Sequence, residues 1–312
     1  MKVAILDNVH PLFEKTFNDW GWKVEIASKW TLQDFQKNIL NCDGIVIRSR
    51  IKLDKHNLSF AKKLKFIARP GSGLENIDLE YCKIKNIDVF RSPEGNRDAL
   101  AEHVMGMVLM LNNHLVRANT QVRESIWNRE SNRGTELMGK TFALIGYGFM
   151  GEALAKRLSG FGANVIAFDK YKKNFSSDLV KEVSLDEVFH SADYLSLHTP
   201  LSRDTIGLVD KEFISNFKKS FVFINSARGK SVVLKDLVDS LINGKVSGAC
   251  LDVLELESSS FENVDVNSNK PFEALKKMDN VILSPHIAGW THEAKYKMAD
   301  FLIKKIKGRF QM

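Results

Sequence analysis

Three residues of complementary chemistry, Arg228, Glu257 and His286, stand 29 residues apart along the chain. A guanidinium binds an anionic group through its fork of donors and can polarise a reacting oxygen. An imidazole takes up or releases a proton near neutral pH, and a neighbouring carboxylate orients its ring. Together these groups suit a small molecule that carries a carboxylate and a hydroxyl group. An isolated histidine is more often a core or capping residue, but the surrounding Ser-Pro-His-Ile-Ala-Gly favours a catalytic role.

A strand-like apolar run precedes each of these three residues. The runs comprise residues 221–224, 248–253 and 281–283. In an open parallel sheet the carboxyl ends of the strands lie along one edge, and ligands bind there. We therefore expect the guanidinium, the carboxylate and the imidazole to converge at that edge.

A glycine-rich loop follows a further apolar run, residues 141–145, and leads into a segment with helical spacing. The loop reads Gly146-Tyr147-Gly148-Phe149-Met150-Gly151. Gly146 permits a tight turn, Gly148 lets the backbone approach a pyrophosphate, and Gly151 lets the helix pack close to the strand. The free N–H groups at the helix N-terminus would face the anion. This strand, loop and helix predict a dinucleotide site that includes Phe149 and Met150.

Asp169 ends the next strand-like run, 18 residues beyond Gly151. Its carboxylate can accept hydrogen bonds from ribose hydroxyls and would repel a 2′-phosphate, which favours NAD over NADP. Lys170, Lys172 and Lys173 follow closely and weaken that preference. The alternative is that Asp169 only caps a turn after the strand.

The length, charge and cysteine content exclude several other classes of protein. A chain of 312 residues suits two domains of ordinary size. The net charge of +7 is spread along the chain, so we expect an anionic small molecule as partner and no nucleic acid. Cys42, Cys82 and Cys250 form neither a disulfide pattern nor a metal-ligand pattern, which fits a reducing cytoplasm without a metal site. We find no signal peptide and no run of 18 apolar residues, so no membrane segment is expected.

Strand-like and helical segments alternate along the chain, which predicts an α/β fold with parallel sheets. Strands are also expected at residues 3–6, 44–47, 64–68, 87–90 and 165–168. The nearly continuous apolar stretch at residues 98–115 predicts a buried spine helix, and residues 293–307 predict a final helix that returns to the first domain. The serine- and asparagine-rich segment Ser258 to Lys270 predicts a surface loop.

Several motifs, spread over nearly the whole chain, resemble those of the D-isomer-specific 2-hydroxyacid dehydrogenases, in the order found in that family. Besides the glycine loop they are Gly71-Ser72-Gly73-Leu74-Glu75-Asn76-Ile77-Asp78, Ala101-Glu102-His103, His198-Thr199-Pro200-Leu201, Asn225-Ser226-Ala227-Arg228-Gly229, Ala249-Cys250-Leu251-Asp252-Val253 and Ser284-Pro285-His286-Ile287-Ala288-Gly289. The resemblance implies two Rossmann-like domains. An NAD-binding domain, residues 96–289, would be inserted into a discontinuous, flavodoxin-like substrate domain, residues 1–95 and 290–312.

The resemblance also implies roles for individual residues and a homodimer built on the cofactor domains. Catalysis would rest on Arg228, Glu257 and His286, and the backbone of Ser72 and Gly73 would hold the substrate carboxylate. Asp252 would bind the nicotinamide amide, and the cofactor would also contact His198, Thr199, Pro200 and Ala227. In the family the catalytic glutamate is usually followed by proline, whereas Ser258 follows Glu257 here, which leaves Glu255 as a less favoured alternative.

Arg48-Ser49-Arg50 is similar to the Arg-Ser-Arg of 3-phosphoglycerate dehydrogenases, in which these arginines face the substrate phosphate. The resemblance therefore favours oxidation of 3-phosphoglycerate to 3-phosphohydroxypyruvate with NAD, a step of serine biosynthesis. A solvated strand end is the alternative interpretation of the two arginines. The alternative activities are a hydroxypyruvate, glyoxylate or D-lactate reductase and, from another class, an NAD-sensing, corepressor-like binding protein.

Overall fold

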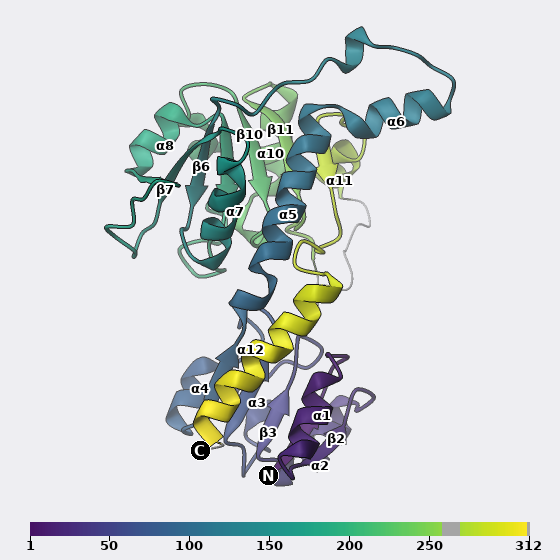
Figure 1. Ribbon diagram of the computed structural model, residues 1–312, viewed down its shortest axis with the longest axis vertical. Coiled ribbons are helices and arrows are strands. Elements are labelled where there is room, and N and C mark those ends of the chain that lie inside the picture. Colours follow the sequence, from purple (N-terminus) through teal and green to yellow (C-terminus); the bar gives the residue numbers. More distant parts are fainter. Residues whose placement is uncertain (258–268, 311–312) are drawn as a thin grey trace. The chain divides into compact units, whose positions relative to one another are not determined.

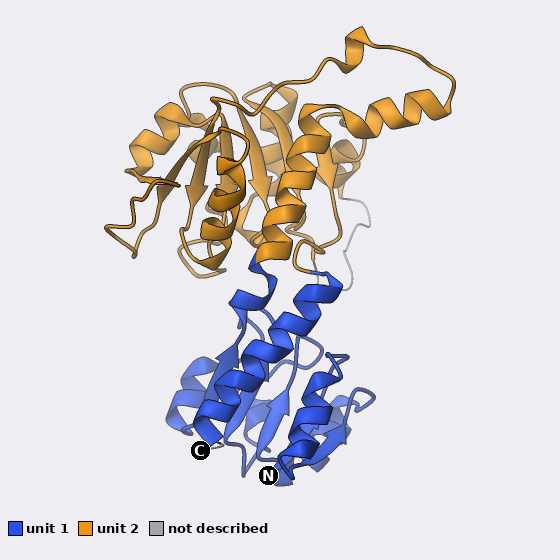
Figure 2. Ribbon diagram, in the orientation of Figure 1, with its two compact units in different colours: residues 1–97, 259–261, 290–312 blue, residues 98–258, 262–289 orange. Residues whose placement is uncertain are grey.

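The computed structural model describes residues 1–257 and 269–310, which form two compact units (Figure 2). Among these residues, unit 1 comprises residues 1–97 and 290–310, and unit 2 comprises residues 98–257 and 269–289. The chain passes from unit 1 into unit 2 and returns, so unit 2 is an insertion into a discontinuous unit 1. Of the loop predicted at residues 258–270, all but the last two residues lie outside the described part of the chain.

A parallel five-stranded sheet with the flavodoxin-like order β2-β1-β3-β4-β5 forms the centre of unit 1 (Figure 1). Its strands are β1 (Lys2–Ile5), β2 (Lys23–Ile26), β3 (Gly44–Val46), β4 (Phe66–Arg69) and β5 (Asp88–Arg91). Its helices are α1 (Leu12–Asp19), α2 (Leu32–Asn38), α3 (Lys55–Leu58), α4 (Leu79–Ile84) and α12 (His292–Phe310). Apolar residues of α1 and α12 cover one face of the sheet, and those of α2, α3 and α4 cover the other. Because both faces are buried, the central strand β3 is apolar throughout rather than alternating.

Unit 2 is built on a seven-stranded parallel sheet in the order β12-β11-β10-β9-β6-β7-β8. Its strands are β6 (Thr141–Ile145), β7 (Asn164–Phe168), β8 (Lys181–Glu182), β9 (Tyr194–Leu197), β10 (Phe221–Asn225), β11 (Val246–Leu251) and β12 (Val281–Leu283). Apolar side chains of α5 (Pro93–Asn112) and α7 (Phe149–Ser159) cover one face. The opposite face packs against α8 (Leu185–Ser191), α9 (Lys211–Ser215), α10 (Leu234–Ile242) and α11 (Lys270–Leu275). The strand order reverses between β6 and β9, which is where a dinucleotide binds in a doubly wound sheet.

The predicted fold class is confirmed, and the strands that carry the motifs lie within two residues of their predicted starts and ends. The sequence analysis did not predict β2, β8 or β9. The helix expected at residues 98–115 is α5, which begins earlier and ends at Asn112, because His114 adopts a left-handed φ of 51° and a separate helix, α6 (Leu115–Arg123), follows. Glu102, Gly106 and Met110 are exposed one turn apart, so α5 is not buried on all sides as predicted.

Among the described helices, none combines the length and the apolar composition that a bilayer crossing requires.

Candidate active site

The three strands that precede the predicted catalytic residues are neighbours in the sheet of unit 2. Asn225 of β10 is in register with Leu251 of β11, which in turn is in register with Leu283 of β12. Arg228 lies three residues after Asn225, and His286 lies three residues after Leu283. Glu257 lies six residues after Leu251. The predicted convergence at the carboxyl edge is confirmed.

Close contacts fix the loop that carries Arg228 and pack it against the next loop. The Asn225 side chain, 1% exposed, accepts a hydrogen bond from the Ala227 N–H and donates one to the Arg228 carbonyl, both at 3.0 Å, which fixes the turn that carries Arg228. Gly229 lies so close to the next loop that a Cβ there would overlap the carbonyl group of Leu254. Arg228 Nη1 donates to the Ala227 carbonyl at 2.6 Å.

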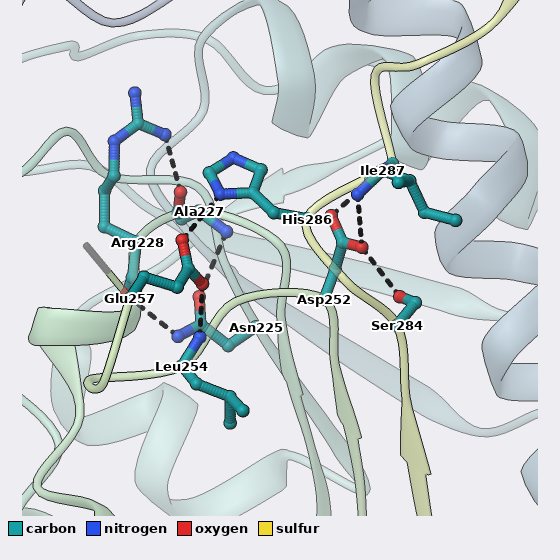
Figure 3. A network of polar contacts seen from close by, with 10 residues as sticks. Asn225, Ala227, Arg228, Asp252, Leu254, Glu257, Ser284, His286 and Ile287 are labelled. Carbon is teal, nitrogen blue, oxygen red and sulfur yellow. Dashed lines mark hydrogen bonds and ion pairs between the residues drawn. The ribbon is translucent and has the colours of Figure 1, made fainter. Parts of the chain in front are cut away.

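Glu257 and His286 form a direct pair (Figure 3). Glu257 Oε2 lies 2.7 Å from His286 Nδ1, and their side chains are 11% and 25% exposed. The other carboxylate oxygen of Glu257 accepts the backbone N–H of Leu254 at 2.5 Å, which holds the carboxyl group in place. If the Nδ1 proton faces this carboxylate, Nε2 is the nitrogen that exchanges a proton with a ligand.

Glu255, the alternative to Glu257, has a different role. Its Oε2 accepts the backbone N–H of Leu234 at 2.9 Å, at the start of α10. A carboxylate at this position satisfies a free N–H at the helix N-terminus and interacts favourably with the helix dipole. Of the two glutamates, Glu257 is therefore the partner of the imidazole.

His286 adopts a left-handed backbone conformation, with φ of 56°. Its N–H donates to the Asp252 carbonyl at 2.7 Å, and the Asp252 carboxylate accepts the N–H groups of Ile287 and Ala288 at 2.8 and 2.9 Å. Asp252 is 1% exposed. It anchors the His286 loop, whereas its predicted contact with the nicotinamide amide stays a prediction.

The glycine loop has the geometry that a pyrophosphate requires. Gly146 has a φ of 94°, and a Cβ there would lie 2.8 Å from the His198 carbonyl oxygen, while a Cβ at Gly151 would lie 2.5 Å from the Gly146 carbonyl oxygen. A Cβ at Gly148 would meet no atom within 4 Å, so the open space beside this residue is on the ligand side of the loop. Gly148 caps α7 without a side-chain hydrogen bond, so the first N–H groups of α7 are available to an anion.

Asp169 follows β7 and accepts three backbone N–H groups. Tyr147 donates to Oδ2 at 2.8 Å, and Tyr171 and Lys172 donate to Oδ1 at 2.9 Å each. Partial burial opposes ionisation, but the N–H groups of Lys172, Tyr147 and Tyr171 and the charge of Lys172 together lower the pKa of Asp169. The carboxylate therefore caps the turn, as the alternative interpretation held. It retains lone pairs for a ribose hydroxyl, because a carboxylate has about four acceptor sites.

The lysines after Asp169 are paired with carboxylates on the surface of unit 2. Lys170 Nζ lies 2.5 Å from Asp204 Oδ2, and Lys172 Nζ lies 2.5 Å from Glu152 Oε1. A 2′-phosphate would have to compete with these carboxylates, which supports NAD as the nucleotide.

The loop after β9 supplies His198 and Thr199 next to the glycine loop. Burial lowers the pKa of His198 to about 4, and its Nε2 lies 3.0 Å from Ser196 Oγ. Within residues 1–257 and 269–310, the buried hydroxyls of Thr199 and Ser226 have no hydrogen-bond partner. Buried hydroxyls normally find a partner, so polar groups of a nucleotide fit this part of the site. Pro200 is exposed, and Ala227 is buried beside Ser226.

The two arginines of the Arg-Ser-Arg motif have different surroundings in unit 1. Arg50 donates from Nε and Nη2 to the Leu6 carbonyl at 2.9 and 2.6 Å, from Nη1 to the Trp30 carbonyl at 2.6 Å and from Nη2 to the Ala27 carbonyl at 3.0 Å. Its guanidinium thus ties the ends of β1 and β2 together, and the phosphate-facing role predicted for it stays a prediction. The guanidinium carbon of Arg48 lies 3.9 Å above the ring of Trp290.

Ser72 and Gly73 follow β4 in unit 1. Ser72 Oγ donates to the Asn96 side chain at 3.0 Å, and the Ser72 carbonyl accepts from Arg91 at 3.1 Å, so the loop is held in place. In the described part of the chain, no acceptor lies within hydrogen-bond distance of the backbone N–H of Ser72 or Gly73. Both N–H groups are therefore available to a carboxylate.

The sequence analysis missed three residues that contribute to the site or to its support. Asn225 fixes the turn that contains Arg228. Ser284 donates a hydrogen bond to Asp252 at 2.7 Å, and the ring of Trp290 stacks with the guanidinium of Arg48. Asn225 and Ser284 each lie within a motif quoted above, but the motif does not indicate which partner they contact. Trp290 lies next to the last motif and carries no periodic signal.

Fold and site together define a class of protein, the dinucleotide-dependent oxidoreductases. In this class the protein positions the substrate and supplies charge and protons, whereas the cofactor carries the hydride. This class does not by itself identify the protein family, because proteins with doubly wound sheets catalyse many different reactions.

Comparison with known proteins identifies the family. Residues 105–288 match the model of the D-isomer-specific 2-hydroxyacid dehydrogenase NAD-binding domain. The chain is 36% identical over 286 residues to hydroxypyruvate reductase of Thermotoga maritima, which covers 91% of this chain and 90% of the relative. It is 33% identical over 308 residues to D-3-phosphoglycerate dehydrogenase of Archaeoglobus fulgidus, covering 98% of this chain and 56% of the relative. The chain thus spans about half the length of this second relative.

Solved structures agree with this assignment. D-lactate dehydrogenase from Aquifex aeolicus, complexed with NAD and lactic acid, is similar with a TM-score of 0.83 and 29% identity, covering 99% of this chain and 95% of that one. The chain belongs to the D-isomer-specific 2-hydroxyacid dehydrogenase family, and it is an oxidoreductase with NAD as its cofactor.

Proposed function

We propose that this protein interconverts a short D-2-hydroxy acid and the corresponding 2-keto acid. The observation that carries the proposal is the 2.7 Å contact between Glu257 and His286, beside Arg228, at the edge of the sheet that also bears the glycine loop. Bound NAD would accept the hydride from C2 of the hydroxy acid, or NADH would return it to the keto acid. The loop of Gly146, Gly148 and Gly151 would hold its pyrophosphate.

His286 is the general acid and base in this proposal. In the oxidising direction neutral Nε2 takes the hydroxyl proton, and in the reducing direction the imidazolium returns it to the carbonyl oxygen. Glu257 orients the ring through Nδ1 and stabilises the imidazolium. Arg228 pairs with the substrate carboxylate and stabilises the negative charge that develops on the reacting oxygen. The role expected for the backbone of Ser72 and Gly73 in unit 1, to hold the substrate carboxylate, stays a prediction.

Hydroxypyruvate, with glyoxylate as a smaller relative, is the substrate that we favour. A phosphorylated substrate would need Arg48 and Arg50 to bind its phosphate. The guanidinium of Arg50 already donates hydrogen bonds to three backbone carbonyls, which favours an unphosphorylated substrate. The Thermotoga maritima relative, 36% identical over nearly its whole length, is a hydroxypyruvate reductase.

3-Phosphoglycerate is the second candidate, because Arg48 gives it specific support. Stacking on Trp290 orients the guanidinium of Arg48, and an oriented guanidinium can present two parallel donors to a phosphate. The Archaeoglobus fulgidus relative is a D-3-phosphoglycerate dehydrogenase. If this candidate is correct, the protein acts in serine biosynthesis.

A panel of acids assayed with NAD(H) and NADP(H) tests these proposals. Wild type and the variants His286→Ala, Arg48→Ala and Arg50→Ala are each given hydroxypyruvate, glyoxylate, D-lactate and 3-phosphoglycerate, and the change in NADH absorbance is followed. We expect wild-type turnover with NADH on hydroxypyruvate. We expect His286→Ala to lose about 10² to 10⁴ in turnover while it still binds NADH, because only the general acid and base is removed.

The arginine variants decide between the two substrates. If 3-phosphoglycerate is the substrate, Arg48→Ala raises its KM about tenfold to a hundredfold, because a charged hydrogen bond contributes about 1.5 to 3 kcal/mol. Arg50→Ala is the matched control, which we expect to lower the thermal stability of unit 1 and to affect all substrates equally. Activity on none of the acids, together with tight NADH binding, would contradict the enzymatic proposal and favour an NAD-sensing binding protein.

We also propose that the protein is a homodimer of the cytoplasm. The location is supported by Cys42, Cys82 and Cys250, which are all free and buried, as expected in a reducing compartment. The dimer is supported by α6 and the following chain, in which Leu115, Val122 and Trp127 are exposed to 49%, 54% and 79%. Exposed apolar side chains in such number on one segment are typical of an interface.

A further inference from the structure

The Asp252 carboxylate is the centre of a buried network that extends beyond the His286 loop. It accepts the N–H groups of Ile287 and Ala288 on one side and the hydroxyl of Ser284 at 2.7 Å on another. Figure 3 shows Ile287 and Ser284 beside Asp252. His103 of α5 lies 3.5 Å from the same carboxylate through Nε2. All of these groups belong to unit 2.

The chemistry of the donors fixes the direction of these hydrogen bonds. An ionised carboxylate can only accept, so the Ser284 hydroxyl proton points to Asp252 Oδ1. The Ser284 oxygen is then the acceptor for His103 Nε2, at 2.9 Å. With this direction His103 Nε2 is the donor to Ser284 Oγ, and a continuous chain of hydrogen bonds runs from His103 through Ser284 to Asp252.

The network connects three elements that the sequence separates widely. His103 lies on α5, Asp252 follows β11, and Ser284 follows β12. The last members of the network, the N–H groups after His286, hold this residue at its positive φ of 56°. A free chain would leave this conformation, because a residue with a Cβ rarely adopts it.

We propose that Ser284 and His103 are positioning residues for the proposed general acid and base. They hold the Asp252 carboxylate in the orientation in which it anchors Ile287 and Ala288, and this anchoring keeps the His286 imidazole against Glu257. Neither residue touches the reacting atoms. The inference rests on the proposed function of His286, but the structural part of it, the anchored loop, is measurable without any activity.

Hydrogen exchange and kinetics on the full-length protein test the inference together. The variants are Ser284→Ala, which removes the hydroxyl, Ser284→Thr, which keeps it, and His103→Phe, which removes the donor. Ser240→Ala is the matched control, because Ser240 is also a buried serine of unit 2 but donates to the Asp236 carbonyl on α10. Amide exchange is followed in the peptide that contains Ile287 and Ala288, and the melting temperature shows whether each variant is folded.

In Ser284→Ala and His103→Phe we expect faster exchange at Ile287 and Ala288. We expect kcat to fall about 10- to 100-fold, as misplacement of a catalytic group by about 1 Å can do. The NADH dissociation constant and the KM should change far less than kcat, and Ser284→Thr should restore most of the activity. Ser240→Ala should leave both the exchange and kcat at their wild-type values.

Two results would overturn the inference, and each is distinct from failure of the proposed function. Unchanged exchange at Ile287 and Ala288 in folded Ser284→Ala would show that the network does not anchor the loop. Faster exchange with kcat within a factor of about two of wild type would show that the anchored loop does not position the imidazole. If wild type has no activity on the acid panel, the function is wrong, and the exchange result still decides whether the loop is anchored.

Discussion

At the scale of single residues, His286 shows how the surroundings maintain an unfavourable conformation. A left-handed backbone at a residue with a Cβ costs about 1 to 3 kcal/mol. Three hydrogen bonds to Asp252 from consecutive N–H groups offset that cost, since each contributes about 1 kcal/mol. His286 therefore keeps its left-handed backbone, and its ring faces Glu257.

His198 provides a pH-dependent prediction at the same scale. Its pKa is lowered by burial from 6.5 to about 4, so the folded protein keeps it neutral where the unfolded chain would bind a proton. The free energy of unfolding is therefore fully retained above about pH 6.5 and falls as the pH drops from there towards 4. The loss from this residue amounts to at most about 3 kcal/mol.

The comparison of wild type with His198→Gln isolates this contribution. Urea unfolding between pH 7.5 and 5 should show a steeper decline for wild type than for the variant. His190→Gln is the control, because His190 is an exposed histidine of the same unit. Parallel curves for wild type and His198→Gln would mean that His198 titrates normally in the folded protein.

The residue types at the site were predictable from the sequence, whereas their contacts were not. Arg228, Glu257 and His286 each follow a strand, and the rule that parallel strands end at one edge was sufficient to bring them together. The contacts of Arg50 could not be predicted, because a motif indicates that a guanidinium is present but not which carbonyls surround it. The carbonyls of Leu6, Ala27 and Trp30 come from loops after β1 and β2, and no local pattern links them to Arg50.

At the scale of elements, the glycines between β6 and α7 have different surroundings. A Cβ at Gly148 meets nothing within 4 Å, and the residue has an extended backbone that alanine can adopt. A Cβ at Gly151 would press on the Gly146 carbonyl oxygen at 2.5 Å. Gly148 thus borders open space, which we propose a ligand fills, whereas Gly151 packs against the fold.

Alanine substitutions at these two glycines should separate binding from stability. We expect Gly148→Ala to melt within a few degrees of wild type but to bind NADH about tenfold more weakly, a loss of about 1.4 kcal/mol. We expect Gly151→Ala to lose about 1 to 3 kcal/mol of stability through overpacking. Fluorescence titration with NADH and thermal melting measure the two effects, and wild-type NADH affinity in Gly148→Ala would contradict the assignment of its open space to the pyrophosphate.

Two of the strands that the sequence analysis missed, β2 and β8, share a physical reason. β2 lies at an edge of the sheet of unit 1 and has Lys23 and Glu25 among its four residues. β8 lies at an edge of the sheet of unit 2 and consists of two polar residues. Edge strands need little apolar sequence, so their pattern is weak. The end of α5 was also missed, because only the left-handed backbone of His114 stops a helix whose apolar pattern continues.

At the scale of the whole molecule, the chain crosses between the units twice, after Arg97 and after Gly289. The second crossing falls three residues beyond His286, so the proposed general acid and base lies close in sequence to a connection between the units. Trp290 is the first residue of unit 1 after this crossing, and its ring stacks with the guanidinium of Arg48.

The segment from α6 to residue 136 has several exposed apolar side chains and extends away from the sheet of unit 2 (Figure 1). Of the residues of α6 none is buried. The segment is nevertheless ordered internally, since Arg117 Nε donates to the Asn132 side chain at 3.0 Å, and Asn132 donates to Gln121 at 2.7 Å. An ordered segment with unburied apolar side chains is expected to pack on a second copy of the chain.

The location of this segment is compatible with catalysis in each copy. Its base borders a cavity of about 300 Å³ lined by Leu111, His114, Tyr194 and Val222, among other residues. Tyr194 and Val222 stand at the amino-terminal ends of β9 and β10, on the sheet edge opposite Arg228 and His286. Association there leaves the catalytic edge of unit 2 uncovered.

Charge substitutions on this segment test the dimer. We expect Trp127→Glu combined with Val122→Lys to convert a dimer into a monomer at micromolar concentration, since a buried aromatic residue often dominates an interface and an unpaired charge there is costly. Light scattering coupled to size-exclusion chromatography measures the mass, and Ile84→Glu, at a 74% exposed position of α4 in unit 1, is the matched control. A wild-type mass of about 35.4 kDa, that of one chain, would contradict the dimer, and an unchanged dimer in the double variant would place the interface on another surface.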